Sequence, residues 1–404
     1  MTSVEERIVQ RLNMLAGAIG CRHSGTPGNL AAAAFLADEM RALGLEVEEQ
    51  RFEIPSWTVE EQYLKAAGQE LAVYANPYSP SCAVEAELAA VGTLAELEQA
   101  DLGGKIAVLY GDLTRAPISA KSWFLTEDRD RRILELLEAN PPAVILAVQA
   151  APGSTNRIFE DWEFLLPSAT LPAESGRVVL LHAGERAEVR LRTVSGRGTT
   201  ANIIGRRQGT RPETLVLCAH YDTKVDTPGA NDNAAGVAAM LAAAELLRED
   251  VLDCNLELVA FTNEEYLPIG DDTYLERRGE GFLDRVLMAI NFDGPGHIVD
   301  VNSLASFTCS AEFQAEVEAV SRAYPAVQWV EPWPQSNHST FAMRGVPALA
   351  FSSRAIWLYS HQHDDSLRWV HPPRLLECAQ LAADIVRRMH ARPLGWMRPE
   401  AAAE

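Results

Sequence analysis

The sequence predicts an α/β fold, with a mostly parallel or mixed sheet flanked by helices on both faces and with an inserted β-rich lobe. Two observations in the C-terminal half support this prediction. Short apolar runs typical of buried strands alternate with segments of helical periodicity, a pattern expected when helices cover both faces of a sheet. Polar residues that can bind a metal follow several of these runs, where open α/β sheets form their sites.

The elements of the main sheet come from both ends of the chain. Apolar residues recur with helical spacing from Glu5 to about Leu45, where Gly44 ends the helix before a strand-like segment at residues 45–52. This segment is predicted to form an edge strand. Further on, strands are predicted at 215–219, 256–261, 286–290 and 348–351, and helices at 234–247, 312–324 and 374–389.

The pattern changes between Trp57 and Gly196 to short β-rich pieces, such as residues 105–110 and 143–148, around a charged helical segment at 128–139. We interpret this region as an inserted lobe, with the Gly-rich residues 195–198 as the linker that returns to the main fold. The predicted domains are therefore a catalytic domain at 1–56 and 197–390, an inserted lobe at 57–196, and a tail rich in Pro and Ala at 391–404.

The composition excludes some classes of partner. With 35 basic and 56 acidic residues among 404, the formal charge of −21 argues against nucleic acid or an anionic membrane. The N-terminus lacks the pattern of a secretory signal, and the longest apolar stretch, residues 236–247, is too short to span a bilayer. Because the six cysteines are also scattered without paired spacing, we expect a cytoplasmic protein with free thiols.

Two adjacent glutamates, Glu264 and Glu265, follow the apolar run at 256–261. Carboxylates at the end of a buried strand are costly to desolvate and repel each other, so a cation or a catalytic role is expected there. Adjacent glutamates usually lie on a solvated helix face, but the strand-like run before this pair disfavours that interpretation. A pair of metal ions is the natural candidate.

Other potential ligands come after strand-like runs or open turns. They are His220 with Asp222, then Asp232, Asp293 and His361. Taken alone, a His-x-Asp pair is common on protein surfaces, and Asp293 before a Gly-Pro-Gly turn suits a turn cap. Their number and order along the chain favour a metal site.

These motifs resemble those of the zinc-dependent aminopeptidases, the family that includes bacterial leucine aminopeptidases, aminopeptidase Y, glutamate carboxypeptidase and the glutaminyl cyclases. The resemblance covers roughly the C-terminal half and matches in order and local spacing. A looser resemblance to the protease-associated domain of some family members runs from Ala90 to the strand at Lys105. The matching motifs are His220-Tyr221-Asp222-Thr223, Pro228 to Val237, Asn263-Glu264-Glu265, Asn291-Phe292-Asp293, and His361 with Asp365-Ser366-Leu367.

The resemblance implies specific roles for the matching residues. His220 and Asp293 would bind one zinc ion, Glu265 and His361 a second, and Asp232 both; another divalent ion stays an alternative to zinc. This set leaves each metal room for a water, as catalytic zinc requires. The resemblance also implies that Glu264 is the general base and that the peptide bond after Asp232 is cis.

Several polar residues near these motifs leave alternatives. We expect Asp222 and Asp365 to accept hydrogen bonds from the imidazoles of His220 and His361, with Asp222 acting beside Glu264 in catalysis. His363 competes with His361 as a ligand, and we choose His361 because Asp365-Ser366-Leu367 follows at the family's offset. His338 lies where the family has a segment near the substrate, and His23 is expected to make loop hydrogen bonds.

The predicted function is a dizinc metallopeptidase that removes N-terminal amino acids from peptides. A carboxypeptidase or a hydrolase of N-acyl amino acids or other amides could use the same metal centre. A receptor-like or scaffold protein on the peptidase fold is disfavoured because no ligand is missing. We expect a peptide or small amide as substrate, no nucleic acid or membrane partner, and we leave self-association into a homo-oligomer open.

Overall fold

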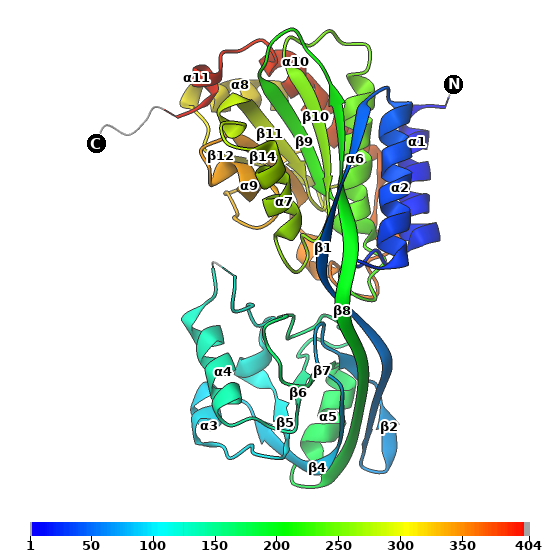
Figure 1. Ribbon diagram of the computed structural model, residues 1–404, viewed down its shortest axis with the longest axis vertical. Helices are drawn as coiled ribbons and strands as arrows, with labels where there is room; N and C mark the ends of the chain where they lie inside the picture. The colour runs from blue at the N-terminus through cyan, green and yellow to red at the C-terminus, as the bar shows by residue number, and fades with distance from the viewer. Residues whose placement is uncertain (1, 124, 400–404) are drawn as a thin grey trace, which may run out of the picture. The chain divides into compact units, whose positions relative to one another are not determined.

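A computed structural model describes residues 2–123 and 125–399 of the chain (Figure 1). The chain forms two compact units. The first comprises Met1–Ile54 and Thr199–Glu404, and the second comprises Pro55–Gly198. Each boundary lies two residues from the predicted limits of the inserted lobe at 57 and 196.

The first unit is built on a mixed sheet whose central strands are parallel. Strand β9 (Thr214–His220) pairs in parallel with β10 (Asn255–Phe261) and β11 (Val286–Phe292). Almost every residue of these strands is buried, as expected for strands covered on both faces. Beyond β11, the sheet continues with β14 (Ala348–Ser353), which is parallel to β11, then with β12 (Asn302–Phe307), which is antiparallel to β14, and with β13 (Gln328–Trp329), which is parallel to β12. Beyond β10, it continues with β8 (Arg186–Arg207), which is antiparallel to β10 and pairs also with β1 (Glu46–Ala66).

Alternate side chains of β9 face two separate cores, because successive residues of a strand point to opposite faces. Leu215 and Leu217 pack with the larger set of helices, whereas Val216 and Cys218 pack with the aromatic residues of α7 and α9. The helices of the larger set are α1 (Val4–Leu12), α2 (Pro27–Ala42), α6 (Gly236–Leu246), α8 (Ala311–Ser321), α10 (Pro372–Met389) and α11 (Leu394–Met397); the second face has α7 (Ile269–Arg278) and α9 (His338–Ala342), and η4 (Leu283–Arg285) precedes β11.

The N-terminal segment is interrupted between its helices. After α1 and the π-helical segment η1 (Asn13–Ile19), Gly20 adopts a φ of 74° and ends the helical path. The chain resumes as a helix at α2, where the Thr26 side chain accepts a hydrogen bond from the Asn29 amide and Pro27 occupies the first turn. The prediction of one continuous helical stretch from Glu5 is wrong at this break, which brings residues 21–25 beside the loops that follow β9.

The second unit is β-rich, and its described residues form three α-helices. Strands β4 (Cys82–Val91), β5 (Ile106–Leu109), β6 (Val144–Val148) and β7 (Ser168–Leu171) run parallel in that order, and β8 pairs antiparallel with β4. The likeness of this unit to a protease-associated domain stays a prediction. Its remaining elements are β2 (Gln69–Leu71), β3 (Tyr74–Ala75), α3 (Leu94–Gln99), η2 (Gly111–Thr114), α4 (Asp128–Ala139) and α5 (Ala173–Leu181).

One expectation about the connecting segments is corrected. Residues 195–198, expected to be a linker, lie inside the long strand β8, whose other residues pair with β4 on one side of this stretch and with β10 on the other. The tail also contains structure, because α11 packs Met397 into the core and the Met397 carbonyl accepts a hydrogen bond from the Ser310 amide at 2.9 Å. Residues 400–404 of the tail lie outside the described residues. Within the described part of the chain, none of the helices has the length and apolar character of a membrane span.

Candidate metal centre

The carboxyl ends of β9, β10 and β11 meet at one edge of the sheet. His220 is the last residue of β9 and lies opposite Phe261, the last residue of β10, in the parallel register. Asp293 directly follows β11, which pairs Asn291 with Cys218 of β9. The parallel order of these strands therefore gathers residues that are far apart in the sequence at the edge where open α/β sheets form their sites.

The two adjacent glutamates point in different directions because the chain turns in front of them. Asn263, which follows β10 after one residue, adopts a left-handed φ of 66°. The backbone amides of Glu264 and Glu265 then donate to the two oxygens of Asp222, each at 3.3 Å. The Asp222 carboxylate thus holds the turn that separates the two glutamates.

Asp232 lies in an irregular turn, η3 (Ala230–Ala235), just before α6. The turn is packed against the end of β11, since the Asn233 side chain donates to the Phe292 carbonyl at 2.8 Å and accepts from the Gly236 amide at 2.9 Å. A Cβ atom on Gly236 would lie 2.2 Å from the Phe292 carbonyl oxygen, so glycine is needed for this close approach. The Asp232–Asn233 peptide bond is cis, as the family resemblance implies.

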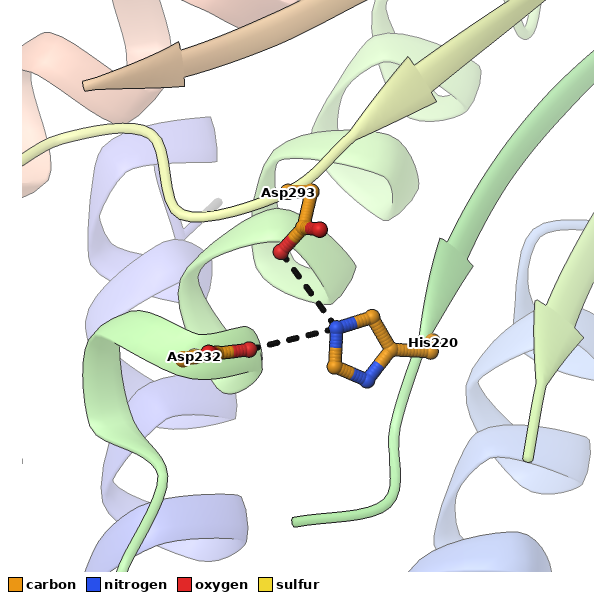
Figure 2. A group of neighbouring side chains, drawn as sticks. All are labelled: His220, Asp232 and Asp293. Atoms are coloured by element: carbon orange, nitrogen blue, oxygen red, sulfur yellow. Dashed lines mark hydrogen bonds and ion pairs between the residues drawn. The ribbon is translucent and has the colours of Figure 1, made fainter. Parts of the chain in front are cut away.

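A first group of ligand atoms surrounds the imidazole of His220. Its Nε2 atom lies 3.2 Å from Asp232 Oδ1 and 3.3 Å from Asp293 Oδ1 (Figure 2). The three side chains come from the end of β9, the turn before α6 and the end of β11, and they point toward one another. We call this group the His220 subsite.

A second group shares Asp232 with the first. His361 Nε2 lies 3.0 Å from Asp232 Oδ2 and 3.2 Å from Glu265 Oε2. The three ligand atoms of this group, like those of the first, all lie within 4.8 Å of one another. We call it the His361 subsite. The two oxygens of one carboxylate thus face two different imidazoles, so the structure brings together all five residues predicted to bind metal.

His361 lies in the loop between η5 (Ile356–Leu358) and η6 (Leu367–Trp369). Support of its ring by Asp365 stays a prediction. The Asp365 oxygens accept the backbone amides of Asn231 at 2.8 Å and Asp232 at 2.9 Å, so this carboxylate positions the turn that carries Asp232. Burial raises the pKa of Asp365 to about 7. Asp222 does face its expected partner, with Oδ1 3.6 Å from His220 Nδ1.

The electrostatics of the cluster are those of a site that gathers negative charge. Burial disfavours the charged imidazole of His220, but the carboxylates of Glu264 and Asp293 outweigh it and raise its pKa. Burial, helped by Asp293 and Glu265, also raises the pKa of Glu264 well above its usual range. Because buried carboxylates without cations are costly, the cluster favours bound positive charge.

The residues present fit a pair of zinc ions. Each subsite offers one imidazole and two carboxylates, and imidazole nitrogen and carboxylate oxygen are both zinc ligands. Glu265 Oε1 is buried and has no hydrogen-bond partner, although Oε2 faces His361. An unpaired buried carboxylate oxygen at this position is the observation expected of a ligand that a cation would satisfy.

The competing histidines lie outside both subsites. His363 Nε2 is 3.9 Å from Asp226, and His338 is buried with Nε2 2.8 Å from the Trp333 carbonyl oxygen. Burial lowers the pKa of His338 to about 4. The carbonyl of His23 accepts hydrogen bonds within its own loop from Thr26, as expected.

One positioning residue, Arg22, was not predicted from the sequence. Arg22 is fully buried, and its guanidinium donates to five backbone carbonyls. Burial lowers its pKa to about 10. No pattern in the sequence distinguishes this arginine from a surface one, because its partners are backbone atoms. The five acceptors are the carbonyls of Leu15, Gly20, Tyr221, Pro228 and Gly229.

The fold and the ligand set together define a metallopeptidase. Residues 202–386 match peptidase family M28, and this segment holds all five ligand residues and both catalytic candidates. The segment that carries the site is therefore similar to peptidase family M28.

The chain is similar to known aminopeptidases over most of its length. Aminopeptidase YwaD of Bacillus subtilis is 28% identical over 407 residues, which cover 93% of this chain and 82% of that protein. A probable leucine aminopeptidase 2 of Aspergillus oryzae is 23% identical over 83% of this chain and 69% of its own. In structure, a zinc aminopeptidase from Bacillus subtilis matches with a TM-score of 0.80 and 22% identity over 99% of this chain and 98% of that one. The fold class predicted from the sequence is confirmed by this match.

Proposed function

We propose that the protein is a zinc-dependent aminopeptidase that holds two zinc ions and removes the N-terminal residue of a peptide. The observation that carries the proposal is the position of Asp232, whose two oxygens lie 3.2 Å and 3.0 Å from the imidazoles of two subsites. The relatives that match most of the chain are named aminopeptidases, which supports this reaction over the alternatives.

We assign separate roles in hydrolysis to the metal ligands and to Glu264. His220 and Asp293 would hold one ion, Glu265 and His361 the other, and Asp232 both. When bound, zinc polarises a carbonyl and lowers the pKa of a water molecule. Glu264 lies 3.9 Å from His220 Nε2 and is 21% exposed, so it borders the cluster and still reaches solvent.

Glu264 is assigned the proton transfers. Its carboxylate takes a proton from the attacking water and returns it to the departing amine nitrogen, which leaves as a neutral amine when the C–N bond breaks. The pKa of Glu264 is raised by burial, and a raised pKa suits a carboxyl group that must carry a proton between two steps. Asp222 keeps Glu264 in place by accepting its backbone amide.

The test compares substrates that differ only at their ends. Leucine p-nitroanilide should be cleaved, its N-acetyl form should not, and an N-blocked dipeptide with a free carboxyl end should resist. A chelator should abolish cleavage and zinc should restore it, with two zinc ions per chain by elemental analysis. Cleavage of the blocked substrates would instead favour a carboxypeptidase or an N-acyl amino acid hydrolase, and activity that survives chelation would end the proposal.

A cytoplasmic location stays part of the proposal. It is supported by the six cysteines, all of which are free, as expected in a reducing compartment. We further propose that small peptides or amides, rather than nucleic acid, are the partners of this acidic chain.

A further inference from the structure

Lys224 lies against the metal centre and has no role in the reaction as proposed. It is 8% exposed, and its ammonium donates to the backbone carbonyl of Glu265. The same nitrogen lies 3.9 Å from Glu265 Oε2, the oxygen that faces His361. A buried ammonium is thus fixed beside a ligand of only one of the two subsites.

The surroundings of Lys224 hold it in this position. Its ammonium lies 4.2 Å from the centre of the Tyr266 ring, a favourable cation–π arrangement. The Tyr266 hydroxyl accepts the amide of Val225 at 2.9 Å, and the ring meets His23 edge-on at 5.3 Å. Because the stem, the ring and the backbone are all packed, the charge cannot move away from Glu265 by a simple change of rotamer.

The His220 subsite has the opposite surroundings. Besides its own carboxylates, Asp222 Oδ1 lies 3.6 Å from His220 Nδ1 and Glu264 Oε2 lies 3.9 Å from Nε2. Asp365 accepts the backbone amide of Asp232, the residue that both subsites share, so its charge does not distinguish the two subsites. The His220 subsite therefore has two additional acidic neighbours, whereas the His361 subsite has an additional ammonium.

We propose that Lys224 is a positioning residue that makes the two subsites unequal, so that the His361 subsite binds zinc more weakly and fills second. The ammonium repels an incoming cation and competes with it for Glu265, while Asp222 and Glu264 attract a cation to the His220 subsite. This inference rests on the proposed function, because it requires that both subsites take zinc.

The test is a zinc titration of the full-length apoprotein in competition with a chromophoric chelator, which reads affinity without any assay of activity. The wild-type protein should show two steps, and His361→Ala should remove the weaker one. Lys224→Met, which removes the charge but keeps the length of the stem, should tighten the weaker step about tenfold or more and leave the stronger step within about threefold. Lys224→Arg keeps the charge and should keep the wild-type pattern.

The outcomes separate this inference from the proposed function. Two steps that stay unchanged in Lys224→Met, or a weaker step that loosens, would overturn the role of Lys224 and leave the dizinc centre standing. A wild-type protein that binds a single zinc ion would overturn both. Damage to the fold would loosen binding rather than tighten it, and Lys224→Gln, which keeps a hydrogen-bond donor, supplies a second uncharged variant if the Met protein does not fold.

Discussion

Asp365 accepts the backbone amide of Asp232 at 2.9 Å, although 133 residues separate the two along the chain. The other oxygen of Asp365 accepts the amide of Asn231, so one carboxylate holds two successive peptide groups of the turn. The shared ligand of the two subsites is therefore positioned by the loop that also carries His361. A substitution of Asp365 should therefore alter the position of Asp232 and weaken metal binding.

Asp365→Asn should weaken zinc binding about 10- to 100-fold, the usual effect of removing a group that orients a ligand. An asparagine has one accepting oxygen, and its amide group would oppose one of the two backbone amides. The measurement is competitive zinc titration of the apoprotein. Asp364→Asn is the matched control, because its carboxylate is 47% exposed and pairs with Arg368 on the surface. Equal affinities in the two variants would contradict the assignment.

Glu264→Gln and Glu265→Gln should separate catalysis from metal binding at neighbouring positions. The first variant should keep two zinc ions per chain and lose about 10²- to 10⁴-fold in kcat, the contribution expected of a general base. The second should lose zinc from the His361 subsite, since Glu265 Oε2 faces His361 at 3.2 Å. Elemental analysis beside steady-state kinetics distinguishes the two. A Glu264→Gln protein of near-normal turnover would show that another group moves the proton.

Arg22→Met should destabilise the protein strongly. The substitution leaves the carbonyls of Gly20, Tyr221 and Pro228 without their donor, whereas those of Leu15 and Gly229 still accept backbone amides. Each unsatisfied group costs about 1–3 kcal/mol when no water replaces the donor. We expect the free energy of unfolding of the apoprotein to fall by at least about 3 kcal/mol in urea titrations. Arg41→Met, at a side chain that is 51% exposed, should change it by no more than about 0.5 kcal/mol. A small effect at Arg22 would mean that its hydrogen bonds are dispensable.

Asp271 should make stability depend on pH. Its carboxylate is buried, accepts hydrogen bonds from Asn337 at 2.9 Å and from Thr340, and has its pKa raised by burial from 3.8 to about 6. A pKa that is higher in the folded state than in the unfolded state means that the folded state binds the proton more tightly. The stability that comes from protonation is therefore fully present below about pH 4 and lost as the pH rises through about 6.

Asp271→Asn removes this dependence. The stability of the variant relative to the wild-type protein should rise by about 2 kcal/mol between pH 4 and pH 7, whatever constant difference the amide introduces. Urea unfolding of both apoproteins at several pH values measures this difference. Asp272→Asn, at the exposed neighbouring position, should show no such trend. A flat difference for Asp271→Asn would contradict a raised pKa at this carboxylate.

Local patterns in the sequence sufficed to predict the central strands. The runs that end at His220, Glu264 and Asp293 are apolar enough to require burial on both faces of a sheet, and a parallel sheet brings the ends of such strands to one edge. Polar residues after these runs were candidates for a metal site, and the resemblance of their motifs to those of the zinc aminopeptidases supplied the choice of the five ligands. Segments whose strand or helix character depends on distant partners were predicted less well, as at residues 195–198, which lie inside β8.

The sequence by itself determined the α/β class, and its resemblance to a known family pointed to the five side chains that lie together in the structure. Only the tertiary structure decided that Asp365 holds the Asp232 turn, that Arg22 is buried among carbonyls, and that Lys224 lies beside Glu265. The physical reason is that these contacts involve backbone atoms or residues far apart in the chain. Such partners leave no periodicity in the sequence, and they exist only once the strands and loops have packed.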